Sequence, residues 1–83
     1  MADLGLTGIA HIAIRARDID TMVAFYTEKL GFAEMFRLNQ ASGALMLVYL
    51  RITDEQYLEL FPNGVGESVP GPQDVGLNHL CLT

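Results

Sequence analysis

The stretch GIAHIAIRARDIDTMVAFYTEKLGF, residues 8–32, changes its hydrophobic period near the middle. The first part, IAHIAIR, is rich in aliphatic and β-branched residues and alternates along its length, which predicts a strand. The alternation places Ile12 and Ile14 on one face of that strand. His11 and Arg15 then share the other face.

The second part of the stretch predicts a single helix of about three turns. Its apolar residues follow helical spacing, at Ile19, Met22, Val23, Tyr26 and Leu30. Asp18 or Asp20 can cap the free N–H groups at the start. Gly31 follows the last apolar residue, where a left-handed C-cap conformation favours glycine.

Three further strands are expected before residue 62: FAEMFRL, ALMLVYLRI and YLELF. The turns between them are NQASG and TDEQ, which contain residues that tolerate turn geometry. The strand that contains ALMLVYL is apolar on both faces, so we expect it to be central in the sheet or to lie in an interface. The predicted order of elements is therefore β-α-β-β-β.

The last part of the chain repeats the first strand. Residues 62–76 hold all three prolines and read as a linker. GLNHLCLT, residues 76–83, then matches GIAHIAI in frame, so that His79 corresponds to His11. We expect a βαβββ module over 8–61, a Pro/Gly-rich linker over 62–76, and the first strand of an incomplete second module over 77–83.

Composition restricts the kinds of partner. The net charge is −5, and the five basic residues are scattered, which excludes nucleic acid and anionic membrane as expected partners. The longest apolar run is far shorter than the roughly 20 residues of a membrane span, and the N-terminus has no basic region typical of a secretory signal. With one cysteine no internal disulfide forms, so a small core favours a metal or a partner chain. We expect a cytoplasmic protein that forms a homodimer.

His11, Glu59 and His79 are the candidate metal ligands. Each lies in a strand among apolar neighbours, and a buried carboxylate needs a charge partner or a metal to offset its desolvation. An outward position on an edge strand is the alternative for Glu59. A satisfied core or surface histidine is the alternative for either imidazole. Two imidazoles and one carboxylate suit a divalent ion such as zinc, nickel or iron, and three protein ligands leave open positions for substrate.

Two further residues are candidates for substrate binding. Arg15 lies on the same strand face as His11 and could receive a substrate carboxylate, although an exposed arginine at the end of a strand explains it equally well. Asn63 follows Glu59 by four residues, and from the sequence alone a turn residue before Gly64 is the favoured interpretation.

Together, the stretch over 8–32, YLELF and GLNHLCLT resemble the vicinal oxygen chelate superfamily, which contains glyoxalase I, bleomycin-resistance proteins and extradiol dioxygenases. The resemblance implies two βαβββ modules whose curled mixed sheets enclose a metal. His11, Glu59 and His79 match three of the four ligand positions of glyoxalase-like members. Arg15 and Asn63 match positions that hold the glutathione conjugate in bacterial glyoxalase I, but Gly64 replaces the tryptophan that often follows.

The resemblance implies a metal-dependent lyase or isomerase that acts on a small oxygen-chelating substrate, for example a thiol–aldehyde hemithioacetal. The fourth ligand of that family, an acid that also serves as a catalytic base, has no counterpart in this sequence. The alternatives are a non-catalytic small-molecule-binding protein of the bleomycin-resistance type and an extradiol dioxygenase.

Overall fold

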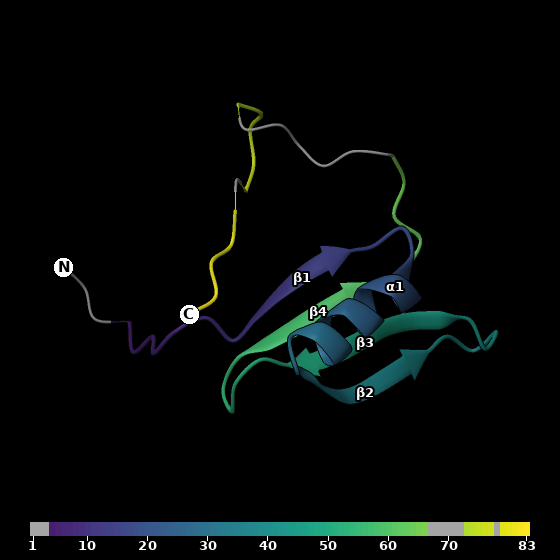
Figure 1. Cartoon of the computed structure of the whole chain (residues 1–83), viewed down its shortest axis with the longest axis horizontal. Coiled ribbons are helices and arrows are strands. Elements are labelled where there is room, and N and C mark those ends of the chain that lie inside the picture. Colours follow the sequence, from purple (N-terminus) through teal and green to yellow (C-terminus); the bar gives the residue numbers. More distant parts are fainter. Residues whose placement is uncertain (1–3, 67–72, 78) are drawn as a thin grey trace.

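A computed structural model describes residues 4–66, 73–77 and 79–83. It confirms the α+β class and the βαβββ order of the module (Figure 1). The elements are β1 (His11–Arg15), α1 (Ile19–Ala24), the π-helical segment η1 (Phe25–Lys29), β2 (Ala33–Asn39), β3 (Leu45–Arg51) and β4 (Tyr57–Phe61). In the described part of the chain, no helix is long and apolar enough to cross a membrane.

The four strands form one mixed sheet in the order β1-β4-β3-β2. β1 and β4 run parallel, whereas the pairs β4–β3 and β3–β2 run antiparallel. Strands β4 and β3 are thus interior, and β1 and β2 are the edges, as Figure 1 shows. The strand that is apolar on both faces is interior, as its sequence predicts.

The helix begins and ends where its sequence signals place it. Asp18 is the N-cap: its carboxylate accepts from the Thr21 backbone N–H at 3.2 Å and from the Thr21 hydroxyl at 2.8 Å. Gly31 takes φ 77°, a left-handed value that favours glycine. The last turns are π-helical over Phe25–Lys29, a change of hydrogen-bond pattern that the hydrophobic spacing does not reveal.

The helix covers one face of the sheet, and the core lies between them (Figure 1). Val48, Leu50, Leu58 and Leu60 are the largest fully buried side chains, and Ile19 and Val23 of α1 pack on them. Ile12 and Ile14 of β1 extend this core at its edge. The opposite face of the sheet carries the alternate residues, and we call it the open face.

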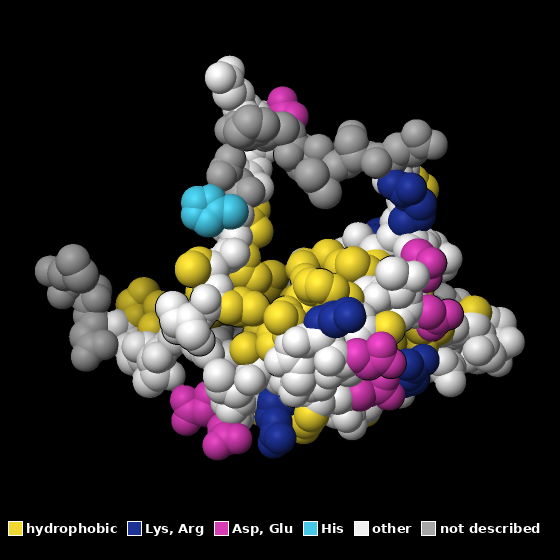
Figure 2. Space-filling view, in the orientation of Figure 1, with side chains coloured by type: hydrophobic (Ala, Val, Ile, Leu, Met, Phe, Trp, Pro, Cys, Tyr) yellow, Lys and Arg dark blue, Asp and Glu magenta, His cyan; other side chains and the backbone are white. Residues whose placement is uncertain are grey.

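The expected fifth strand is not seen in the part of the segment that the structure describes. Residues 77 and 79–83 have no strand assignment, although Asn78 lies outside the described residues. A strand also needs a hydrogen-bonded neighbour, and the four-stranded sheet does not include this segment. Leu80 and Leu82 line a cavity together with Ile12 and Ile52, and Figure 2 shows apolar side chains gathered where the segment approaches the module. Its role as the first strand of a second module stays a prediction.

Candidate functional site

His11 and Glu59 lie on the open face, on neighbouring strands. β1 and β4 pair in parallel with Ala13 opposite Glu59, so His11 is two residues back along β1 on the same face. The spacing between strands and the rise along them put the two Cα atoms about 8 Å apart. At that separation, the side chains of His11 and Glu59 are long enough for both to contact one ion that lies between them.

Glu59 is a half-buried carboxylate without a partner among the described residues. Its strand is interior, so the alternative that placed Glu59 on an edge strand is wrong. It takes part in none of the hydrogen bonds or ion pairs found in residues 4–66, 73–77 and 79–83. A carboxylate in this position is partly desolvated and lacks a compensating charge, which favours a cation beside it.

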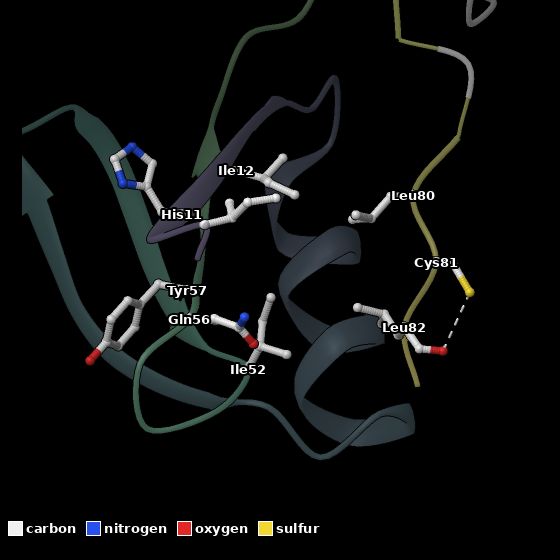
Figure 3. Close-up of a pocket in the computed structure, with 9 residues that line it drawn as sticks. His11, Ile12, Ile52, Gln56, Tyr57, Leu80, Cys81 and Leu82 are labelled. Carbon is white, nitrogen blue, oxygen red and sulfur yellow. Dashed lines mark hydrogen bonds between the residues drawn. The ribbon is translucent and has the colours of Figure 1, made fainter. Parts of the chain in front are cut away.

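The His11 side chain points away from the helix. Figure 3 shows the rings of His11 and Tyr57 on one side of the sheet and Ile12 on the side of α1. The His11 ring is exposed and contacts Tyr49, with ring centroids 5.9 Å apart and planes inclined by 59°. In the described chain both imidazole nitrogens of His11 are without hydrogen-bond partners and are available as ligands.

Arg15 and Asn63 lie at the carboxyl ends of β1 and β4. The Arg15 guanidinium donates to the Pro62 carbonyl oxygen at 2.9 Å and lies over the Phe61 ring, 5.1 Å from its centroid. Asn63 is exposed and takes φ 63°, a left-handed value that asparagine tolerates better than most residues. Arg15 therefore holds the loop after β4 in place, and the remaining guanidinium N–H groups are free to donate elsewhere.

His79 does not form a group of three with the other two candidate ligands. It lies on the exposed C-terminal segment, whose Leu80 and Leu82 line a cavity together with His11 and Ile12 (Figure 3). Across residues 4–66, 73–77 and 79–83, no three His, Cys, Asp or Glu side chains gather in a group that could hold a metal. The structure thus places His11 and Glu59 on one face of adjacent strands and does not gather His79 with them.

Sequence reasoning did not find Tyr49, which lies at the centre of the open face. Tyr49 is directly opposite Glu59 in the β3–β4 register, and its ring contacts those of His11, Phe36 and Tyr57. An aromatic residue inside an apolar run looks like core filling. The distinguishing signal is its pairing with Glu59, which depends on a register that the sequence does not display.

The mixed four-stranded sheet with one covering helix is a βαβββ module, and its open face carries a pair of potential metal ligands. The sequence points to the same class of protein, because residues 8–83 match the family model of the Glyoxalase/Bleomycin resistance protein/Dioxygenase superfamily. The chain belongs to this superfamily.

Among solved structures, the chain is similar to one described as "Crystal structure of UcmS2", with 27% identity and a TM-score of 0.56. The match covers 78% of this chain and 49% of that one, so it spans about half the length of UcmS2. A comparison with curated proteins gives no significant match. Members of the superfamily generally bind divalent metals and small molecules and commonly form dimers.

Proposed function

We propose that the open face forms half of a divalent-metal site in a glyoxalase-type lyase or isomerase. The observation that carries the proposal is the placement of His11 and the unpartnered Glu59 on one face of adjacent strands. One imidazole and one carboxylate are ligands that zinc, nickel and iron accept. Two donors do not complete a coordination sphere, so a second module is required.

The second module has two possible sources. In the first, another chain contributes its own His11 and Glu59 through a two-fold axis, which gives four donors and a homodimer. In the second, the strand around His79 joins the site. We favour the first source, because it supplies four donors, whereas His11, Glu59 and His79 do not gather into one group in the described part of the chain.

The chemistry follows from the ligands and their neighbours. A divalent ion, when bound, would act as a Lewis acid that stabilises negative charge developing on substrate oxygens. His11 and Glu59 would hold it, and the Tyr49 ring would exclude water from one side. Arg15, with free N–H donors at the end of β1, would orient an acidic substrate group, and Asn63 beside it would accept or donate a hydrogen bond.

A metal titration of the chain tests this proposal. Zinc binding is measured by calorimetry, with the mass of the complex from light scattering, for the wild type and for His11→Ala, Glu59→Gln and His79→Ala. We expect one ion per two chains, and at least tenfold weaker binding in the first two variants only. Glu59→Gln keeps the shape of the side chain, so its thermal stability should be close to that of the wild type.

Three results would contradict parts of the proposal. Loss of zinc binding in His79→Ala would replace the two-fold arrangement with the one that uses the C-terminal strand. Unchanged zinc binding in both His11→Ala and Glu59→Gln would contradict a metal site on the open face. Zinc binding without turnover of a thiol–aldehyde hemithioacetal would support the metal site but contradict the proposed reaction.

The second candidate is a non-catalytic small-molecule-binding protein. The observation that favours it is the row of aromatic rings on the open face, from Phe36 through Tyr49 to Tyr57. Ligand pockets are lined mainly by apolar and aromatic side chains with few polar groups. Tight binding of an organic ligand in the presence of a chelator, with no zinc binding, would select this function over the lyase.

A further inference from the structure

Aromatic rings from all four strands meet on the open face. Phe36 of β2 stacks on Tyr49 of β3, with centroids 5.0 Å apart and planes 10° from parallel. Tyr49 also contacts Tyr57 of β4 at 5.3 Å and His11 of β1 at 5.9 Å. We call the rings of Phe36, Tyr49 and Tyr57 the aromatic platform, and Tyr49 is its centre.

A β-bulge in β2 places the outer ring of the platform. Glu34 pairs with Leu50, but Phe36 pairs with Tyr49, so two steps along β2 match one step along β3. The extra residue is Met35. Regular pairing would put Phe36 opposite Val48, which is fully buried on the helix side. The bulge therefore moves an aromatic ring onto the open face, the kind of redirection that bulges produce near functional sites.

The platform is not part of the core. The core cluster contains Val48, Leu50, Leu58 and Leu60 with residues of α1, and it includes none of the three platform rings. Phe36 remains 46% exposed, and Tyr49 and Tyr57 are half-buried. The module thus keeps three rings partly in water at a place where apolar surface is not needed for folding.

The platform adjoins the proposed metal half-site. Tyr49 is opposite Glu59 in the β3–β4 register, and its ring touches that of His11. A flat ring lying on Tyr49 would therefore have its edge beside both proposed metal ligands. Aromatic faces bind other rings in offset or edge-to-face geometry, which an aliphatic group of equal size cannot reproduce.

We propose that the ligand of this site carries a planar aromatic ring, which stacks on the platform with Tyr49 as the residue that determines specificity. The inference rests on the proposed function for the position of the reacting group beside His11 and Glu59. Stacking itself needs only the three rings. The ring would bind by the platform, and its polar substituent would point toward the half-site.

The test uses 2-naphthol, an uncharged fluorescent aromatic alcohol, titrated with the chain in the presence of a chelator and followed by fluorescence anisotropy. The chain has no tryptophan, so the naphthol signal can be excited with little interference. We expect decahydro-2-naphthol, the saturated analogue, to compete at least tenfold more weakly. A tenfold change in Kd corresponds to about 1.4 kcal/mol.

Variants assign the binding to the platform. Tyr49→Leu should weaken 2-naphthol binding at least tenfold, whereas Tyr49→Phe, which keeps the ring, should stay within about twofold of the wild type. Phe25→Leu is the matched control, because Phe25 is a similarly exposed ring that lies on the helix segment η1. Circular dichroism establishes that each variant is folded.

The inference is overturned if the folded wild type does not bind 2-naphthol, if the saturated analogue competes equally, or if Tyr49→Leu binds as the wild type does. These outcomes are separate from failure of the metal site. The chelator removes metal from the naphthol experiment, so a failure of the wild type to bind zinc would not change its result. Binding of 2-naphthol by a chain that does not bind zinc would support the aromatic platform and contradict the metal half-site.

Discussion

At Gly64, the loop after β4 closely approaches the connection between β1 and α1 at the edge of the site. A Cβ atom built there would lie 3.0 Å from the Ala16 carbonyl carbon, 3.1 Å from its oxygen and 3.2 Å from the Arg17 nitrogen. All three are backbone atoms, so the connection between β1 and α1 must shift to admit a methyl group. The same contact includes a hydrogen bond, which the Gly64 N–H donates to the Ala16 carbonyl oxygen at 2.8 Å.

We predict that Gly64→Ala lowers the free energy of unfolding by about 2 kcal/mol. Overpacking of this kind costs about 1–3 kcal/mol, and weakening the hydrogen bond adds about 1 kcal/mol. Lower entropy of the unfolded chain offsets about 0.4–1 kcal/mol. For a chain of 83 residues, the net change corresponds to a fall in Tm of about 8–16 °C.

The assay is thermal unfolding followed by circular dichroism, with Val65→Ala as the control. Val65 is the next residue, and its side chain is almost fully exposed, so its truncation should change Tm little. Without the close approach, Gly64→Ala would stabilise the chain through the unfolded state. A Tm for Gly64→Ala equal to or above that of the control would therefore refute the reasoning, because the two explanations predict opposite signs.

Two other predictions concern the helix cap and the core. Hydrogen bonds from the Thr21 side chain and backbone lower the pKa of Asp18 below its ordinary value of 3.8. The charged cap therefore stabilises the fold above the unfolded-state pKa of Asp18, and this stabilisation is lost as pH falls through the folded-state pKa. The deficit in Tm of Asp18→Ala relative to the wild type should accordingly disappear on acidification. A deficit in Tm that does not change with pH would contradict this explanation. Leu60→Ala should cost about 2–5 kcal/mol in denaturant unfolding, because Leu60 is fully buried between Ile14 and Val48. A cost as small as that of the exposed control Leu77→Ala would show that this side of the sheet is loosely packed.

Local patterns predicted most of the elements, because each depends on neighbours in sequence. A cap at Asp18 or Asp20, a helix stop at Gly31 and a central or interface position for the third strand follow from spacing, propensity and hydrophobicity. The structure has the cap at Asp18 and the third strand inside the sheet. The shared face of His11 and Glu59 could also be anticipated, since their positions in alternating strands fix the parity of each. The family resemblance added the pairing of the two strands, which alternation alone does not specify.

What the sequence did not predict depends on contacts between distant residues. The bulge at Met35 and the ring contacts of Tyr49 are properties of register, which is set by how β2 and β3 pack together. The C-terminal segment repeats the pattern of β1 but forms no strand in its described residues, because a suitable sequence becomes a strand only when it pairs with a sheet edge. His79 is part of that segment, and it does not gather with the other candidate ligands in the described chain.

The bulge in β2 also determines how readily this site can change during evolution. Loss of the single codon for Met35 would remove the extra residue and leave Phe36 opposite Tyr49, so regular pairing would return without a change of partners. Phe36 and Leu38 would stay on the open face, and Arg37, which bonds Glu34, would stay on the helix side. One in-frame deletion at the bulge could thereby shorten the strand and still preserve the aromatic surface. A module of this kind can lose or gain a residue at the bulge while its ligand surface is kept.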